Sequence, residues 1–188
     1  TSRVALAGSH PESRYVVLDV TFQFRLSDFS TAVTYPELAR SLGVEVGARV
    51  PSPDVRAAVL GLRAGKGMVW DPEDLSDHDT WSAGSFFTNP LLSAEQAAAL
   101  PVNAPRFPAE AGLVKTSAAW LIEHAGFGPG FGAPGPATLS TKHTLAVTNR
   151  GHARATDLLD LARSVAAGVE REFGVRLVNE PVLVGCSL

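Results

Sequence analysis

One carboxylate near the end of the chain stands where an acid could take part in chemistry. The two-residue period of a strand places Glu180 on the same face as Val178 and Val182. A carboxyl group among valines either costs desolvation energy or has its pKa raised, a condition that is typical of catalytic acids. A glutamate at the edge of a strand, paired with an arginine, would explain the same residue without catalysis. The pattern alone leaves both interpretations open.

Two cations lie where they could bind an anion. Arg63 and Lys66 are three residues apart at the end of a predicted helix, so their side chains share one face. Cations at this end of a helix also interact favourably with the macrodipole, without any ligand. In the same way, Gly84 and Ser85 before two phenylalanines could form only a tight turn held by core aromatics. Spacing alone favours the structural explanation in both places.

Other motifs carry less weight. Residues 128–133 match G-x-G-x-x-A, but a dinucleotide fingerprint lies between a strand and a helix, whereas here a helix comes before and prolines come after. We interpret this segment as a surface loop. Asp77, His78 and Asp79 could be metal ligands, but neighbouring side chains point to opposite sides of an extended chain and no second cluster has ligand spacing. We therefore predict no metal site and interpret these residues as a solvated acidic loop. Ser85 lacks the G-x-S-x-G context of a hydrolase nucleophile.

The elements that must position these residues follow from periodicity and capping signals. Helices and strands alternate without a regular βαβ order or an internal repeat, which predicts an α+β fold with a domain boundary near Gly67. The predicted elements are a strand over 14–26, a helix over 52–64, a short helix after the capping box Ser93-x-x-Gln96, a helix over 117–125, a strand over 143–149, a long helix capped by Thr156, and a strand over 175–184. Residues 101–108 and 126–136 are predicted loops.

Composition narrows the class of protein. The 188 residues are 45% hydrophobic and carry a net charge of -3, which fits a protein with a substantial core and argues against a nucleic-acid partner. No apolar run approaches the ~18 residues of a membrane span, so no membrane association is predicted. The single cysteine, Cys186, favours a cytoplasmic location. The start at Thr1, without methionine, suggests the edge of a longer protein.

Taken in order, several segments resemble one family, the UDP-N-acetylenolpyruvoylglucosamine reductases, which are bacterial flavoenzymes of cell-wall (peptidoglycan) synthesis. The most specific is Gly84-Ser85-Phe86-Phe87-x-Asn89-Pro90, followed by Asn179-Glu180-Pro181-Val182. The others are Thr34-Tyr35-Pro36-Glu37-Leu38, Arg63-x-x-Lys66, Val114-Lys115 before Ala118-Ala119-Trp120-Leu121-Ile122, and Ser140-Thr141-Lys142-His143. The resemblance covers nearly the whole chain and points to the subfamily with a tyrosine-bearing loop.

The resemblance implies a reaction and roles for individual residues. In this family FAD takes a hydride from NADPH and passes it to UDP-N-acetylglucosamine enolpyruvate, which gives UDP-N-acetylmuramate. Ser85 matches the proton donor, and Glu180 matches the acid that stabilises the developing enolate. The positions that match the substrate-binding residues are Tyr35, Arg63, Lys66, Asn89, Lys115 and His143, of which Tyr35, Lys66, Asn89 and Lys115 surround the pyrophosphate. His143 stands where some members carry glutamine.

The start of the chain departs from the family. Thr1 and Ser2 match only the end of the pattern Tyr-Arg-x-Ser, so the arginine that helps to hold the substrate carboxylate is missing, as is the flavin-binding region. The resemblance implies the trailing part of a flavin-binding domain over 1–68, a substrate-binding domain over 69–179 and a return strand over 180–188. We therefore expect a substrate half that is inactive alone and has a missing flavin domain as its partner. The alternative is a stand-alone UDP-sugar-binding module without catalysis, which the codons upstream of Thr1 would distinguish.

Overall fold

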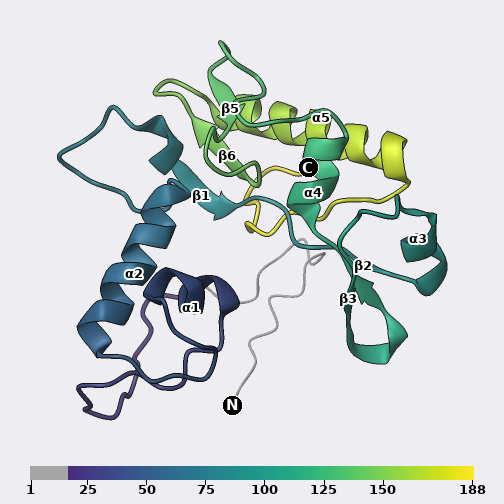
Figure 1. The fold of residues 1–188 in the computed structure, drawn as a ribbon. Coiled ribbons are helices and arrows are strands. Elements are labelled where there is room, and N and C mark those ends of the chain that lie inside the picture. The colour runs from purple at the N-terminus through teal and green to yellow at the C-terminus, as the bar shows by residue number, and fades with distance from the viewer. Residues whose placement is uncertain (1–16) are drawn as a thin grey trace.

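The computed structural model describes residues 17–188 and has the mixed α+β architecture that the sequence predicts (Figure 1). The helices are α1 (Pro36–Leu42), α2 (Ser52–Gly65), α3 (Ala94–Ala99), α4 (Ala118–His124) and α5 (Ala155–Phe173), with short 3-10 turns η1 (His78–Thr80) and η2 (Glu110–Gly112). The strands are β1 (Ser82–Ser85), β2 (Leu91–Leu92), β3 (Phe107–Pro108), β4 (Val114–Lys115), β5 (Ala137–Leu139) and β6 (Ala146–Asn149). Within 17–188, no helix is long and apolar enough to cross a membrane.

The main core lies between an antiparallel sheet of order β1-β6-β5 and the helices α4 and α5 (Figure 1). Helix α5 presents the stripe expected from its sequence, with Ala162, Val165 and Val169 fully removed from solvent. The segment after α5 adds Val175 and Leu177 to the same cluster. A second, smaller antiparallel sheet of order β2-β4-β3 stands to one side of this core.

A separate small cluster forms around α1 and α2. Its buried members are Val33, Ala39 and Val50, and α2 itself has no fully buried residue. Helix α2 confirms the predicted helix over 52–64, with Pro53 in its first turn. Helix α1, which begins directly after Tyr35, was not predicted, because seven residues are too few to show a clear period.

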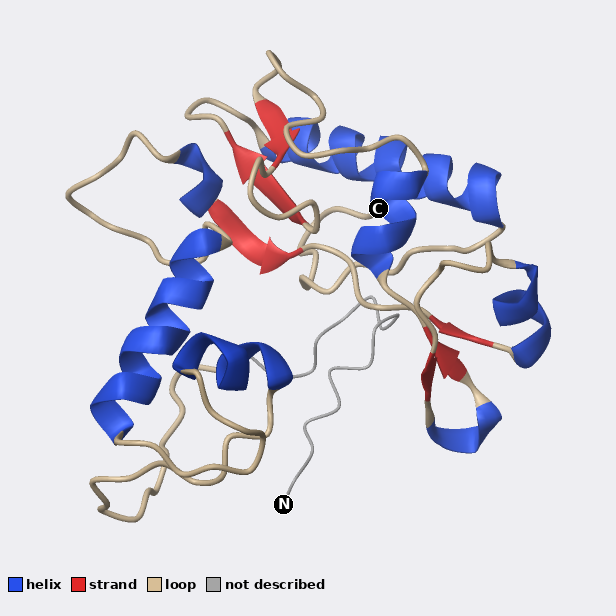
Figure 2. Cartoon of the chain, viewed as in Figure 1, coloured by secondary structure: helices blue, strands red, loops and turns tan. Residues whose placement is uncertain are grey.

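Two predicted strands are wrong. The prediction over 14–26 falls partly outside the described residues, and the remainder, 17–26, is an exposed loop without strand pairing in the described chain (Figure 2). The alternation of apolar residues indicates a strand only where a neighbouring strand accepts its hydrogen bonds. The prediction over 175–184 is reduced to an isolated bridge between Phe87 and Asn179. Pro181 has no N–H to continue that ladder.

The shorter elements follow local signals to different degrees. The capping box is confirmed, since Ser93 Oγ accepts from the Gln96 N–H at 3.1 Å and Gln96 Oε1 accepts from the Ser93 N–H at 3.0 Å. The long helix starts one residue before the predicted cap Thr156, because Asp157 Oδ2 accepts from the Arg154 N–H at 2.7 Å. Strand β6 covers only the second half of the predicted 143–149 strand, and β5 was missed.

Candidate functional site

The segment Gly84 to Pro90 lies at the centre of the predicted site residues. It begins in β1, which pairs with β6 through an irregularity between Ser82 and Ser85. Ser85 ends the strand and is half-buried. Phe87 follows it into the main core, where only 1% of its surface stays exposed. The buried phenylalanine therefore fixes the end of the strand that carries Ser85.

The structure brings the backbones of the two predicted catalytic residues together. The Thr88 N–H donates to the Val178 carbonyl at 2.9 Å, and the Glu180 N–H donates to the Phe86 carbonyl at 2.8 Å. Glu180 is thus held beside the residue that follows Ser85. The predicted row of buried valines around Glu180 is not present, since Val182 is 52% exposed and Glu180 itself is exposed in the described chain.

His143 lies on the turn between β5 and β6, next to the same strand end. The Phe86 N–H donates to the Leu145 carbonyl at 2.7 Å, and the His143 N–H donates to Ser140 Oγ at 3.1 Å. The imidazole is half-buried. Burial lowers the pKa of His143 below its ordinary value, and the nearby Lys66 cation acts in the same direction while Glu123 opposes it. His143 is therefore a neutral ring at neutral pH.

Lys66 connects the end of α2 to the tyrosine-bearing segment. Its Nζ lies 2.9 Å from Glu37 Oε2, and Glu37 is in the first turn of α1, two residues after Tyr35. Both partners are substantially exposed, and ion pairs of this kind contribute little to stability. Lys66 can therefore exchange Glu37 for an anion that carries more negative charge. Tyr35 is 74% exposed, and Arg63, one turn before Lys66, is also exposed.

Asn89 and Lys115 form a second group, at the small sheet. Lys115 is exposed on β4 and lies opposite Leu91 of β2, while the Thr116 N–H donates to the Pro90 carbonyl at 3.0 Å. Asn89 Oδ1 accepts from the Ala118 N–H at 2.9 Å, so Asn89 helps to cap α4. Its two amide N–H donors are the part of the side chain that an anion can use.

The two groups are joined by the chain itself. Ser85, Glu180 and His143 cluster at one end of the segment 84–90, and Asn89 and Lys115 cluster at the other. Within the described residues, no hydrogen bond links a side chain of the first group with one of the second. The site residues therefore line the two ends of a single segment without forming one contact network.

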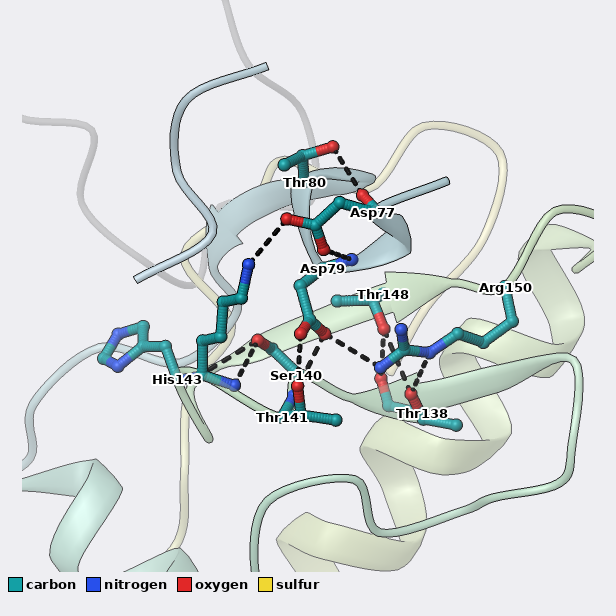
Figure 3. Close-up of polar contacts among 10 residues, drawn as sticks. Asp77, Asp79, Thr80, Thr138, Ser140, Thr141, His143, Thr148 and Arg150 are labelled. Atoms are coloured by element: carbon teal, nitrogen blue, oxygen red, sulfur yellow. Dashed lines mark hydrogen bonds and ion pairs between the residues drawn. The ribbon is translucent and has the colours of Figure 1, made fainter. Parts of the chain in front are cut away.

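A buried ion pair beside β1 was missed by sequence reasoning (Figure 3). Asp79, interpreted as part of a solvated loop, is only 3% exposed and lies 2.9 Å from Arg150 Nη2. Its carboxylate also accepts from the backbone N–H of Thr141 at 3.0 Å and from the Thr141 hydroxyl. The solvated interpretation is wrong for Asp79 because its partners lie more than sixty residues away in sequence. No local sequence signal predicts these partners.

This ion pair gives the fold a pH-dependent contribution. Burial alone would raise the pKa of Asp79, but the bonds from Thr141 and the Arg150 cation outweigh it and hold the pKa below its ordinary value. The folded state thus binds the proton less readily than the unfolded state. The stabilisation is present above the ordinary value of 3.8 and is lost as the pH falls through the lower pKa of the folded protein.

We predict that Asp79→Asn lowers the free energy of unfolding by about 2 kcal/mol at neutral pH, the range for a hydrogen bond to a charged group. The difference from the unmodified protein should shrink below about pH 4, because the native carboxyl group is then becoming neutral as well. Urea denaturation at a series of pH values measures both. A difference that stays constant down to low pH would show that the charge of Asp79 does not stabilise the fold.

The glycine-rich segment 128–133 is the loop that the sequence predicts. It follows α4 and leads to β5, and the Leu139 N–H donates to the Phe131 carbonyl at 2.9 Å. An added Cβ at Gly132 would lie 2.8 Å from the Ala137 carbonyl oxygen, so this glycine lets the loop pack against β5. No strand precedes the loop and no helix follows it directly. This geometry does not fit the phosphates of a dinucleotide.

Comparison with known proteins gives a consistent result. A family described as "UDP-N-acetylenolpyruvoylglucosamine reductase, C-terminal domain" matches residues 74–184. This chain is 59%, 58% and 57% identical to proteins named UDP-N-acetylenolpyruvoylglucosamine reductase from Streptomyces coelicolor, Cutibacterium acnes and Thermobifida fusca. The alignments cover 96%, 93% and 93% of this chain and 49%, 46% and 51% of those proteins. The chain spans about half the length of the curated relatives that it matches.

Proposed function

The chain belongs to the UDP-N-acetylenolpyruvoylglucosamine reductase family, and from this membership we propose that it is the substrate-binding half of such an enzyme. The observation that carries the proposal is the position of Ser85 at the end of β1, flanked by the His143 turn on one side and by Glu180 on the other. We propose that the complete protein reduces UDP-N-acetylglucosamine enolpyruvate to UDP-N-acetylmuramate with NADPH, in peptidoglycan synthesis, and that it works in the cytoplasm.

The reaction adds a hydride and a proton across the carbon–carbon double bond of the enolpyruvyl ether. When bound, the flavin supplies the hydride. Arrival of that hydride at the methylene carbon leaves negative charge that spreads into the substrate carboxylate. Glu180 is the acid that stabilises this developing enolate, and Ser85 donates the proton that the adjacent carbon needs. The double bond is consumed, and the serine alkoxide regains its proton from solvent.

A serine hydroxyl is a weak acid, so its role requires a nearby positive charge. Lys66 is our candidate for the cation that steadies the alkoxide. In support, the Lys66 cation lowers the pKa of His143, whose turn is bonded to Phe86 beside Ser85. Because His143 is neutral at neutral pH, it adds no competing charge and can give a substrate oxygen one hydrogen bond.

The pyrophosphate of the substrate would be met by local cations, in spite of the overall acidic charge. We propose that Lys66 and Lys115 neutralise it as point charges, with the Asn89 amide N–H groups and the Tyr35 hydroxyl as further donors. Arg63, one helical turn before Lys66, extends the same positive surface. Lys66 would exchange its ion pair with Glu37 for the phosphate.

We propose a division of the chain that follows the two hydrophobic clusters. Residues 1–68 form the trailing part of a flavin-binding domain, 69–179 form the substrate-binding domain, and 180–188 return toward the remainder of the enzyme. In support, the cluster around Val33 and Val50 lies before residue 68, and the main core begins at Phe87. Since the loop over 128–133 does not fit a dinucleotide, we assign FAD to other parts of the complete protein.

The two lysines make the binding proposal testable. In the complete enzyme, Lys66→Ala and Lys115→Ala should each weaken binding of the UDP-sugar by roughly 1.5–3 kcal/mol, the value of a hydrogen bond to a charged group. The affinity should also fall as salt is added, more steeply for the unmodified enzyme than for either variant. Isothermal titration calorimetry measures both effects. Unchanged affinity in both variants would remove the lysines from the site.

Two further variants separate binding from other roles. Arg171→Ala removes an exposed cation in the last turn of α5 and should leave the affinity unchanged, so it controls for net charge.

Asn89→Asp keeps the oxygen that caps α4 but replaces the two N–H donors with a negative charge. It should therefore preserve stability and lose affinity. Full affinity in Asn89→Asp would leave Asn89 with its capping role alone.

A further inference from the structure

Asp79 occupies a junction between segments that carry the proposed site residues. It lies in the turn η1, three residues before Ser82, which begins β1, the strand that ends at Ser85. Its carboxylate bonds the backbone N–H and the hydroxyl of Thr141, which is two residues before His143 on the β5–β6 turn. The Asp79 carboxylate thus ties the turn of the histidine to the segment that leads into the strand of the serine (Figure 3).

The same residue also packs against the segment that follows Lys66. An added Cβ at Gly67 would lie 3.0 Å from the Asp79 carbonyl oxygen and 3.1 Å from its Cβ. Such close packing of the two backbones is possible because residue 67 is glycine. The end of α2, with Lys66, is therefore placed against η1 without any intervening side chain.

A second contact reinforces the connection between η1 and the β5–β6 turn. Lys142 Nζ lies 2.6 Å from Asp77 Oδ2, and Asp77 Oδ1 accepts from the Asp79 N–H at 3.1 Å. Ser140 Oγ accepts from the backbone N–H groups of Lys142 and His143 at 3.0 and 3.1 Å. The turn is thus held both from η1 and from within, and the backbone of His143 has a fixed position.

The opposite side of Asp79 is anchored in the sheet. Arg150 donates to the carboxylate through Nη2 and to Thr138 Oγ1 through Nε at 2.6 Å. Thr138 Oγ1 in turn lies 3.1 Å from Thr148 Oγ1, between β5 and β6. A buried carboxylate with a charged partner on one side and two donors on the other has few alternative positions.

We propose that Asp79 is a positioning residue for the proposed reaction: it holds the His143 turn, the end of α2 and the Ser85 strand in one arrangement. The inference rests on the proposed function, but the hold on the turn is a property of the fold. Asp79 acts through Thr141 and Gly67 and is not assigned a contact with the substrate. Loosening it should displace His143 relative to Ser85 and so slow the step that needs both.

The sharpest test removes only the hydrogen bond between the Thr141 hydroxyl and the Asp79 carboxylate. Thr141→Val in the complete enzyme keeps the shape and the backbone N–H but deletes the hydroxyl bond to Asp79. Reoxidation of the reduced flavin by the enolpyruvyl substrate should slow by about tenfold or more, as small misplacements of reacting groups do. Reduction by NADPH should be unchanged, and Thr141→Ser, which restores a hydroxyl, should recover most of the rate.

A second readout does not depend on activity. In Thr141→Val the imidazole of His143 should become more exposed, so its pKa should rise toward the ordinary value, which NMR titration of the ring measures. Asp157→Asn, which weakens the start of α5 away from the site, serves as a control for lost stability and should change neither the rate nor the histidine. The proposal would be overturned if Thr141→Val left both the rate of flavin reoxidation and the pKa of His143 unchanged. It would also be overturned if Asp157→Asn changed both as much as Thr141→Val does.

The two readouts separate this inference from the proposed function. If the unmodified enzyme does not transfer electrons to the enolpyruvyl substrate at all, the reductase assignment fails, whereas the His143 titration still reports on the hold of Asp79. If the unmodified enzyme is active and Thr141→Val leaves both readouts unchanged, the assignment stands and the positioning role is lost.

Discussion

Ser85→Ala in the complete enzyme is expected to slow reoxidation of the reduced flavin by the enolpyruvyl substrate by at least about 10²-fold, the low end of what a positioned proton donor contributes. Reduction of the flavin by NADPH should stay nearly normal, because in the proposed reaction the serine acts only after the hydride has left. The position of Ser85 supports this separation, since it is half-buried at the end of β1, between the His143 turn and Glu180.

Stopped-flow absorbance in each half-reaction measures the two effects separately. Ser85→Cys keeps a small side chain with a proton to donate and should recover part of the loss. Ser164→Ala is a matched control, because Ser164 is exposed on α5 and its hydroxyl donates to the Asp160 carbonyl of the same helix. If Ser85→Ala is slowed only with NADPH, or not at all, Ser85 is a turn residue and Glu180 becomes the next candidate for the proton donor.

Sequence patterns were most reliable where the determinants are local. The capping box at Ser93 and Gln96 and the apolar stripe of α5 are both present, because each depends on residues within one or two turns. The two predicted long strands are wrong for the opposite reason. Alternation over 14–26 and 175–184 specifies which side chains share a face. A strand also needs a second strand to pair with, and the neighbouring sequence does not show which strand that is.

The predicted site shows the same division. The segment resemblance identified Ser85, Glu180 and His143, and the structure brings their backbones together through bonds to Phe86 and Leu145. The resemblance did not identify Asp79, whose partners Thr141 and Arg150 are distant in the sequence. It also missed the capping role of Asn89, which depends on a helix that begins twenty-nine residues later. Long-range polar contacts have no periodic signature in one sequence.

The two phenylalanines of the segment 84–90 should differ sharply in their effect on stability. Phe87→Ala is expected to lower the free energy of unfolding by about 3–5 kcal/mol, the usual cost of truncating a buried aromatic residue. Phe87 is 1% exposed and packs in the main core. Phe86 is half-buried and lines an open groove with Trp81 and Pro181, so Phe86→Ala should cost only roughly 1–2 kcal/mol of burial.

Urea denaturation of both variants and of Phe87→Leu tests this difference, with the leucine expected to recover more than half of the loss because it refills most of the volume. The effect should extend to the site, since Phe87 bridges Asn179 and its core packing holds the backbone between Ser85 and Glu180. Phe87→Leu should therefore slow the substrate half-reaction more than Phe86→Ala does, although it keeps more side-chain volume. Equal losses of stability for Phe86→Ala and Phe87→Ala would mean that Phe87 does not anchor the strand end in the core.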